Sequence, residues 1–279
     1  YNIGNTSKLS SDEDQTIIRT AALFFDMNAS YGEFLFLNVT GRNEWSSTFG
    51  PNRSNFFYPS ASLSFVFTEL IPENNILSFG KLRLAYAQSG ISPLAYTSKT
   101  YYVAPFITDG YTNGSGFPYM GNNGFGISNI LGNPDLKPER VTGKEIGADL
   151  RFFLGRFNID FTYYNQLTTD ILVLRPLAAT SGFQYMRSNT GEMVNRGVEL
   201  IVSGDPVKTS TFGWNISINW AKNYNEVLNL AEGVDEISLE SGFSDIGSYA
   251  IVGDAYGAFY GTKWVRDDDD NLVINPSTG

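Results

Sequence analysis

The chain contains no cysteine and no histidine, and these two absences exclude several classes of functional site. Without cysteine there is no disulfide framework, no thiolate zinc site and no cysteine nucleophile. Without histidine there is no Ser-His-Asp triad and no imidazole-bound metal. Catalysis by a pair of carboxylates is the enzymatic option that these absences leave open.

Charged residues are also scarce, at 17% of the chain, whereas aromatic residues reach 15%. A soluble protein usually carries more charge than this. The sequence nevertheless has no run of about 18 apolar residues of the kind that forms a transmembrane helix, and its mean hydropathy is slightly negative. This combination fits strands that are apolar on one side and polar on the other.

The negative charge lies mainly near the C-terminal end. The net charge is -10, and the segment from Glu226 onward contains 11 acidic and two basic residues, so the first 225 residues are close to neutral. A net negative charge argues against nucleic acid as a partner.

Apolar and polar residues alternate with period two through most of the chain, which indicates β-strands with one apolar face. The clearest run spans residues 212–220 and includes Trp214-Asn215-Ile216-Ser217-Ile218-Asn219-Trp220. The predicted strands have about 10 to 14 residues, and strands of that length tilted near 45° cross a bilayer core. The predicted fold class is therefore all-β, an antiparallel transmembrane β-barrel. A soluble β-sandwich shows the same alternation and stays open as the alternative.

The connections between the predicted strands alternate in length. Short connections are predicted near residues 31, 74, 155 and 207, and long ones near 41–57, 89–138, 175–195 and 225–279. An up-and-down transmembrane barrel has short periplasmic turns and long extracellular loops, so the long segments are predicted to be extracellular. We expect residues 1–279 to form part of a single barrel domain, as an internal fragment of a longer protein, because the chain opens without Met or a basic leader.

Three sets of residues are candidates for chemistry. The run Asp267–Asp270 offers oxygen ligands for Ca²⁺, but it lacks EF-hand spacing, so a solvated acidic turn is the preferred interpretation and no cofactor or metal is predicted. The carboxylates Asp149, Asp160 and Glu199 fall on polar strand faces, where a hydrated lumen explains them more simply than a glycosidase pair does. Aromatic residues in the longest loop could stack on sugars, contact peptides or pack against one another; they are Tyr101, Tyr102, Phe106, Tyr111 and Tyr119.

A ten-residue stretch, 131–140, ends the longest loop and opens the next strand. Its two prolines, Pro134 and Pro138, cannot donate backbone hydrogen bonds and favour extended geometry in the residues before them. Asn133 and Asp135 favour turns. We predict a structural role for this segment, which fixes where the loop ends and where the strand register begins. We call residues 133–139 the rim motif: Asn133, Pro134, Asp135, Leu136, Lys137, Pro138 and Glu139.

The rim motif and several later segments resemble the C-terminal half of the barrel of SusC-like (SusC/RagA) TonB-dependent outer-membrane transporters. The supporting segments occur in the family's order across nearly the whole chain, and they are residues 81–86, 142–147, 160–165, 195–200, 214–219 and 257–261. The resemblance implies a fragment of a large, plugged barrel of about 22 strands in the bacterial outer membrane. It also implies active import of glycans or peptides, with outer-membrane lipid around the barrel, TonB coupling through a missing plug region, and a SusD-like surface lipoprotein as a lid.

Three rival functions remain at the level of sequence. They are a soluble β-sandwich that binds glycans or acts as an adhesin, a carboxylate-dependent glycosidase, and a passive porin. The resemblance favours a transporter that is not an enzyme and has no catalytic residues.

Overall fold

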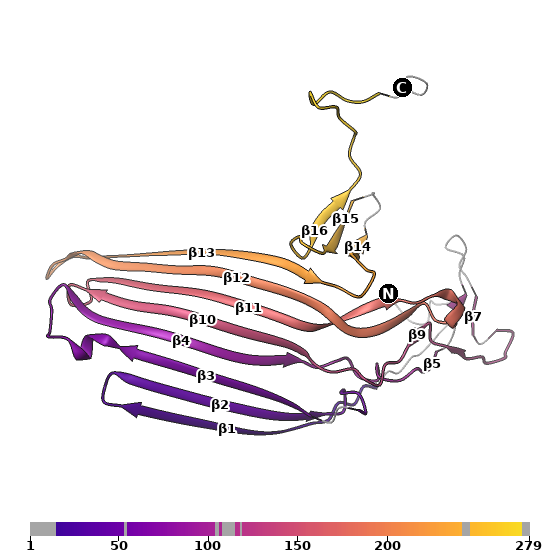
Figure 1. The fold of residues 1–279 in the computed structure, drawn as a ribbon, viewed down its shortest axis with the longest axis horizontal. Helices are drawn as coiled ribbons and strands as arrows, with labels where there is room; N and C mark the ends of the chain where they lie inside the picture. Colours follow the sequence, from indigo (N-terminus) through magenta and orange to yellow (C-terminus); the bar gives the residue numbers. More distant parts are fainter. Residues whose placement is uncertain are drawn as a thin grey trace, which may run out of the picture.

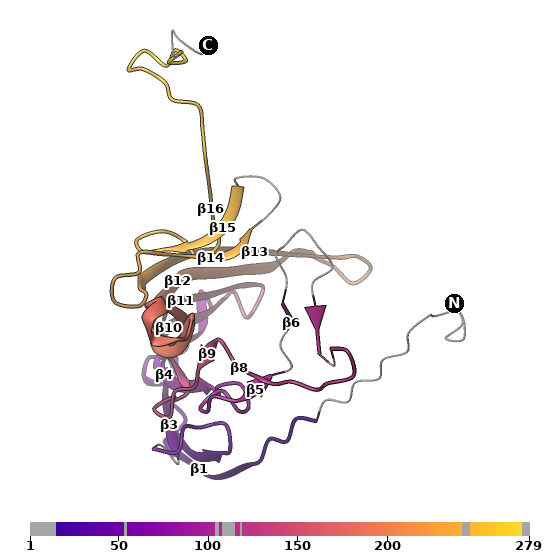
Figure 2. The same cartoon turned by 90° about the vertical axis from the view of Figure 1, so that its right-hand side faces the viewer.

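The computed structural model describes residues 15–52, 55–103, 106–107, 115–117, 119–241 and 246–274. Eight long antiparallel strands of 11 to 24 residues form one sheet in the order β1-β2-β3-β4-β10-β11-β12-β13 (Figure 1). Their bounds are β1 Thr20–Tyr31, β2 Leu35–Ser46, β3 Phe56–Val66, β4 Leu77–Ile91, β10 Glu139–Phe152, β11 Phe157–Pro176, β12 Tyr185–Lys208 and β13 Gly213–Asn229. Viewed along the strands, the sheet is an arc that runs from β1 to β13 (Figure 2).

The strand register sorts the side chains into two faces, because directly opposed residues on paired strands point to the same side of a sheet. Ile159 lies opposite Leu150 and Val202, which gives an apolar row. One residue further along, Asp160 lies opposite Asp149 and Ile201, in a row that is mainly polar. The alternation predicted from the sequence is therefore confirmed, with an apolar face and a polar face that run across all eight strands.

The apolar face is exposed in this single-layered sheet. Leu23 is 70% exposed, and Trp220, at the other side of the arc, is 51% exposed. A β-sandwich would bury such a face against a second sheet, and in the described part of the chain no second sheet covers it. The sandwich alternative is excluded on this observation.

The described residues include no helix that is both long and apolar enough to cross a membrane.

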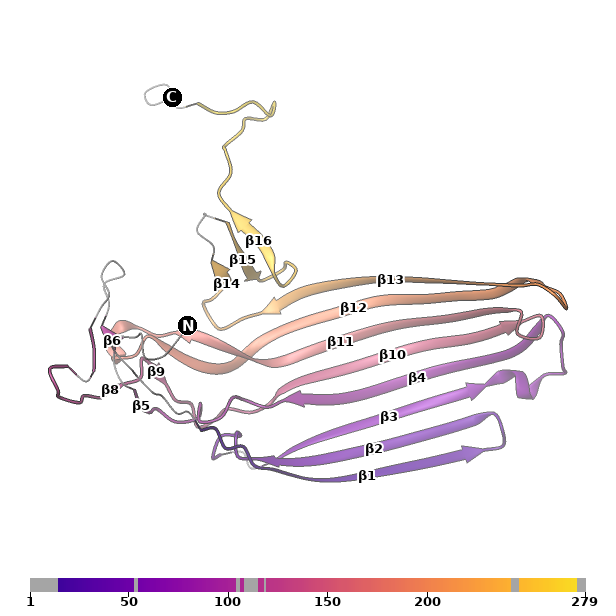
Figure 3. The ribbon, with the colours of Figure 1, turned by 180° about the vertical axis from the view of Figure 1, so that it is seen from behind.

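Three tight turns and one longer connection, 67–76, which contains the short 3-10 helix η2 (Phe67–Leu70), close one end of the sheet (Figure 3). Gly32 lies in the turn between β1 and β2 with φ of 57°, a conformation that glycine adopts without strain. The turn between β10 and β11 has three successive residues with positive φ, which are Phe153 (53°), Leu154 (59°) and Gly155 (83°). Positive φ is uncommon for bulky side chains, so this turn is strained. We call this end of the sheet the turn end and the opposite end the loop end.

Three of the predicted loop boundaries were wrong, because the strands continue beyond the alternating segments. β2 continues to Ser46, inside the segment predicted as loop 41–57, and β12 begins at Tyr185, inside the segment predicted as loop 175–195. The intervening connection is only 177–184, which is shorter than the connection 67–76 at the turn end. Outside the lipid-facing region, a strand is still held by backbone hydrogen bonds to its neighbours. It does not need to alternate apolar and polar side chains there, since water can lie on both faces.

The third corrected segment, 225–279, begins inside β13 and also contains a small antiparallel sheet. Its strands are β14 (Glu236–Ser241), β15 (Ile246–Ile251) and β16 (Ala258–Gly261). Val227 of β13, Leu230 and Ala250 of β15 form a buried cluster that attaches this sheet to the main one. The remaining short strands lie in the segment between β4 and β10: β5 (Tyr102–Val103), β6 (Phe106–Ile107), β7 (Ser115–Gly116), β8 (Gly126–Ile127) and β9 (Ile130–Leu131).

Candidate functional site

The polar face carries ordered charge pairs near the turn end of the sheet. The Lys81 ammonium lies 3.5 Å from a carboxylate oxygen of Asp149, and Arg151 lies 3.7 Å from the same oxygen. Arg83 approaches Asp160 at 2.6 Å and also contacts the Thr162 hydroxyl at 3.3 Å. The carboxylates Asp149 and Asp160, predicted to face a hydrated lumen, therefore each have a cationic partner on the same face.

A polar depression of about 360 Å³ lies further along the same face, between β10 and β13. Its lining combines carboxylates with amides, hydroxyls and a phenol: Glu145, Thr162, Tyr164, Gln166, Asn195, Glu199 and Asn223. The Tyr164 hydroxyl donates to the side-chain oxygen of Asn223 at 3.0 Å. Such a wall offers both donors and acceptors to a solute with hydroxyl or amide groups.

The rim motif is the best-packed part of the loop end. Leu136 is fully buried, and Pro138 is less than 2% exposed. The backbone N–H of Gly50, in the connection between β2 and β3, donates to the carbonyl oxygen of Leu136 at 3.0 Å. A Cβ on Gly50 would overlap the carbonyl oxygen of Pro134, so the two chain segments approach as closely as glycine allows.

Polar side chains connect the rim motif to β11 and β12 near the loop end of the sheet. Lys137 donates its backbone N–H to Oδ1 of Asn189 at 3.0 Å, and Nδ2 of Asn189 donates to the carbonyl oxygen of Lys137 at 2.7 Å. The same Nδ2 donates to the carbonyl oxygen of Asp170 at 2.8 Å, while the Lys137 ammonium pairs with the Asp170 carboxylate at 2.6 Å. Glu139 accepts the backbone N–H of Leu172 at 3.0 Å.

The first half of the rim motif forms a second set of connections. Nδ2 of Asn133 donates to the carbonyl oxygen of Arg187 at 2.9 Å, and its Oδ1 accepts the backbone N–H of Asp135 at 3.0 Å. Asp135 in turn accepts Nδ2 of Asn52 at 2.6 Å. The motif thus joins the connection after β2 to β12, and a polar cleft of about 730 Å³ opens beside it, lined by Asn52, Asn55, Asn133, Asp135, Lys137, Ser188, Asn189 and Thr190.

Sequence reasoning missed Asn189, Asp170 and Asn52, although they are the partners of the rim motif. Asn189 lies 52 residues from Lys137, and Asn52 lies 83 residues from Asp135. No local pattern marks these partners, because their positions depend on the pairing of distant strands. Asn189 lay inside the segment predicted as a loop, whereas the structure places it in β12.

Asn189→Ala is expected to destabilise the folded protein by about 1–3 kcal/mol, because it leaves two carbonyl oxygens and one N–H without their partner. Asn55→Ala is the matched control, since Asn55 lines the same cleft but is exposed and makes one bond, to the side chain of Asn43. The control should change stability by no more than about 0.5 kcal/mol. Thermal unfolding of the full-length protein in detergent checks both values, and equal unfolding temperatures would contradict the role given to Asn189.

The predicted loop aromatics are not gathered into one cluster by the described residues. Tyr101, Tyr102 and Tyr119 are 49%, 73% and 52% exposed. Tyr102 belongs to β5, and Tyr119 forms an isolated bridge with Asn122. Phe106 lies in β6, with its side chain outside the described part, and Tyr111 lies outside the described residues. A role in substrate contact stays a prediction for all five.

The acidic run forms a turn closed by its own hydrogen bonds. Asp267 accepts the backbone N–H of Asn271 at 2.8 Å and that of Asp269 at 3.0 Å. The hydrogen bond from Asn271 lowers the pKa of Asp267, because it stabilises the charged form. Arg266 lies 3.6 Å from Asp270. Among the described residues no group of three or more acidic, histidine or cysteine side chains has the geometry of a metal site, and calcium binding here stays untested.

The family model and the similar proteins all point to one family. The family model for "TonB dependent receptor-like, beta-barrel" matches residues 1–275. TonB-dependent receptor P39 of Formosa agariphila is 30% identical over 94% of this chain and 23% of its own length. TonB-dependent receptor SusC of Bacteroides thetaiotaomicron is 26% identical over 90% of this chain and 26% of its own length. The chain therefore spans about a quarter of the length of these relatives.

The solved structures show the same fold. The RagAB peptide transporter superposes with a TM-score of 0.73 at 24% identity, over 90% of this chain and 26% of that chain. The RagAB peptide importer in its closed-closed state gives the same TM-score over 91% of this chain and 28% of that chain. The sheet described above is thus an arc of a large outer-membrane barrel.

Proposed function

The chain belongs to the TonB-dependent receptor-like β-barrel family, and from this premise we propose that it is one arc of an active importer of glycans or peptides. In the outer membrane the apolar face meets lipid, and the polar face lines the interior of the barrel. The family is one of transporters, so the proposal assigns the chain no covalent chemistry.

The polar wall is the observation that carries this proposal. It runs from the charge pairs around Asp149 and Asp160 to the depression near Tyr164 and Glu199. A glycan offers hydroxyl groups and a peptide offers amides, and both can exchange hydrogen bonds with such a surface. The relatives named above include a peptide importer, which supports the peptide class, and the homologue SusC supports the resemblance noted from the sequence.

The loop end is the proposed docking surface for a SusD-like lipoprotein lid. The exposed Tyr102 and Tyr119 lie in the long connection between β4 and β10, and the rim motif holds the base of that connection. Exposed aromatic side chains on a segment with a fixed base suit a partner that must open and close over the barrel. Coupling to TonB is proposed to act through the part of the receptor that lies outside this chain.

The decisive experiment measures uptake of labelled oligosaccharides and peptides by cells that produce the full-length receptor, with and without functional TonB. We expect accumulation of one substrate class against its gradient, and loss of that accumulation when TonB is inactivated. A passive porin would admit the same solutes at the same rate in both strains, and that result would contradict the proposal. Co-purification of a surface lipoprotein with the receptor tests the lid separately.

A further inference from the structure

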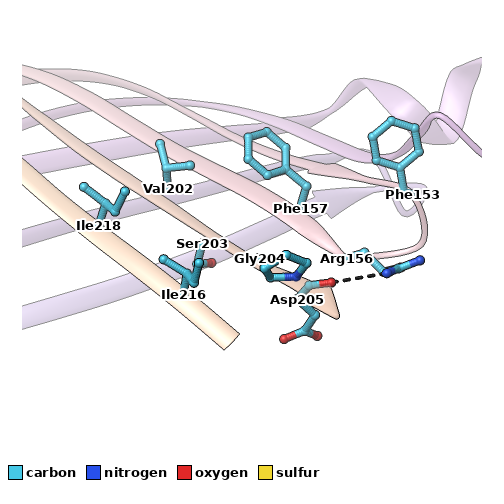
Figure 4. Close-up of a pocket in the computed structure, with 10 residues that line it drawn as sticks. Phe153, Arg156, Phe157, Val202, Ser203, Gly204, Asp205, Ile216 and Ile218 are labelled. Atoms are coloured by element: carbon cyan, nitrogen blue, oxygen red, sulfur yellow. Dashed lines mark hydrogen bonds between the residues drawn. The ribbon is translucent and has the colours of Figure 1, made fainter. Parts of the chain in front are cut away.

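A hollow on the apolar face lies near the turn end of the sheet, on the side that meets lipid. It has a volume of about 420 Å³, which falls in the range of about 300–1,000 Å³ typical of ligand pockets. Val202, Ile216 and Ile218 form one wall, Phe153 and Phe157 form the other, and Arg156 lies at its end toward the turn (Figure 4).

Gly204 lies in the lining of the hollow, opposite Phe157 on one side and opposite Ile216 on the other. A Cβ at this position would come within 2.9 Å of the Arg156 carbonyl oxygen and 3.5 Å of the Phe157 ring, so the glycine lets Phe157 pack close to the backbone of β12. The register between β12 and β13 then shifts between Gly204 and Val207, which interrupts the apolar row at the same place.

A cation with no charged partner stands at the polar end of the hollow. Arg156 donates from Nη2 to the main-chain carbonyl oxygen of Asp205 at 3.3 Å, and in the described part of the chain no carboxylate forms an ion pair with it. The Asp205 carboxylate is engaged elsewhere, by Nδ2 of Asn215 at 2.8 Å and by the Lys208 ammonium at 3.9 Å. The Arg156 guanidinium therefore keeps donors for an anionic group.

The strained turn between β10 and β11 also contributes to the hollow. Phe153 is held at φ of 53° and contributes its ring to the wall. Glycine or asparagine would occupy such a position at lower cost, so a phenylalanine here carries an energetic penalty. An apolar groove next to an available guanidinium is complementary to a molecule with a hydrocarbon tail and an anionic head.

We propose that this hollow binds one phospholipid of the inner leaflet, with an acyl chain against Val202, Ile216 and Ile218 and the phosphate on Arg156. The leaflet follows from the position of the hollow beside the turn 153–156, because the short turns of outer-membrane barrels face the periplasm. The bound lipid would fasten the barrel wall at the strained turn between β10 and β11.

The test measures the lipid retained by the full-length receptor after reconstitution with vesicles of phosphatidylethanolamine and phosphatidylglycerol, extraction into detergent and native mass spectrometry. We expect a phospholipid adduct on the wild-type receptor. Arg156→Gln should lower its retention about tenfold, the effect of losing one charge-assisted hydrogen bond. Lys208→Gln removes the same charge from the same end without changing the lining of the hollow, and it should retain the adduct.

A second pair of variants tests the apolar part. Ile216→Trp places a larger ring in the hollow and should abolish the adduct, whereas Ile146→Trp adds the same ring elsewhere on the apolar face, opposite Leu84 and Tyr163, and should not. Diacylglycerol, which has the tails but no phosphate, should bind as weakly to wild type as the phospholipid does to Arg156→Gln.

Three results would overturn the proposal. They are equal retention by Arg156→Gln and Lys208→Gln, equal retention of diacylglycerol and phospholipid by wild type, and preferential retention of lipid A, which belongs to the outer leaflet. If Ile216→Trp does not assemble, the comparison between Arg156→Gln and Lys208→Gln decides the matter alone.

Discussion

Leu200→Lys is expected to destabilise the folded receptor by about 2–4 kcal/mol, because it places an ammonium group near the middle of the lipid-facing band. Leu200 lies in β12 opposite Phe161 and Trp220, both on the apolar face. The bilayer offers no water to that face, and the residues around position 200 offer no counter-charge. Urea unfolding of the full-length receptor in lipid vesicles measures the change in free energy.

The next residue along the strand is the matched control. Ile201 is also aliphatic, but it lies on the polar face, opposite Asp160 and Asn219. A lysine at position 201 would face water and lie beside a carboxylate, so Ile201→Lys should change stability by less than about 1 kcal/mol. Similar losses for the two variants would mean that the two faces of β12 do not differ in solvent, which would contradict the barrel assignment.

This pair also shows why so much of the fold could be predicted from the sequence. A strand repeats every two residues, so the side of each residue follows from parity once the register is known. The aromatic and aliphatic residues at 212–220 give that parity directly. Hydrophobicity alone would place the aliphatic Ile201 on the apolar face. Its pairing with Asp160 and Asn219 shows that it lies on the polar face.

The ends of the strands could not be predicted in the same way. Alternation reports a difference between lipid and water, and that difference disappears where a strand leaves the membrane. The residues of β12 from Tyr185 to Asn195 pair with β11 through backbone hydrogen bonds while their side chains alternate only weakly. Predictions based on alternation therefore stopped short of the strand ends at the loop end of the sheet.

The candidate site shows the same limit. The rim motif was found because its prolines, asparagine and aspartate have strong local preferences. Its partners, Asn52, Asp170 and Asn189, have no local signal, since strand pairing over tens of residues brings them together. The hollow at Gly204 was also missed, because an isolated glycine in a strand becomes informative only when its cross-strand neighbours are known.

Leu136→Ala is expected to cost about 2–5 kcal/mol and to release the long connection between β4 and β10 from the rim. Leu136 is fully buried, and its carbonyl oxygen accepts the backbone N–H of Gly50 at 3.0 Å. Truncation leaves a cavity at the point where this connection meets the one after β2. Because backbone segments on both sides are already in close contact, they cannot move inward to fill the cavity without breaking their hydrogen bonds.

The matched control is Leu94→Ala, in the same connection but at a site where the side chain is 64% exposed. It should change stability by no more than about 0.5 kcal/mol. Limited proteolysis of the full-length receptor in detergent reports opening of the segment 92–138, and thermal unfolding reports the whole barrel. If the rim motif holds the connection in place, Leu136→Ala raises the cleavage rate in that segment far more than Leu94→Ala does. Equal cleavage rates would show that the connection is held by other contacts, and the structural role of the motif would have to be abandoned.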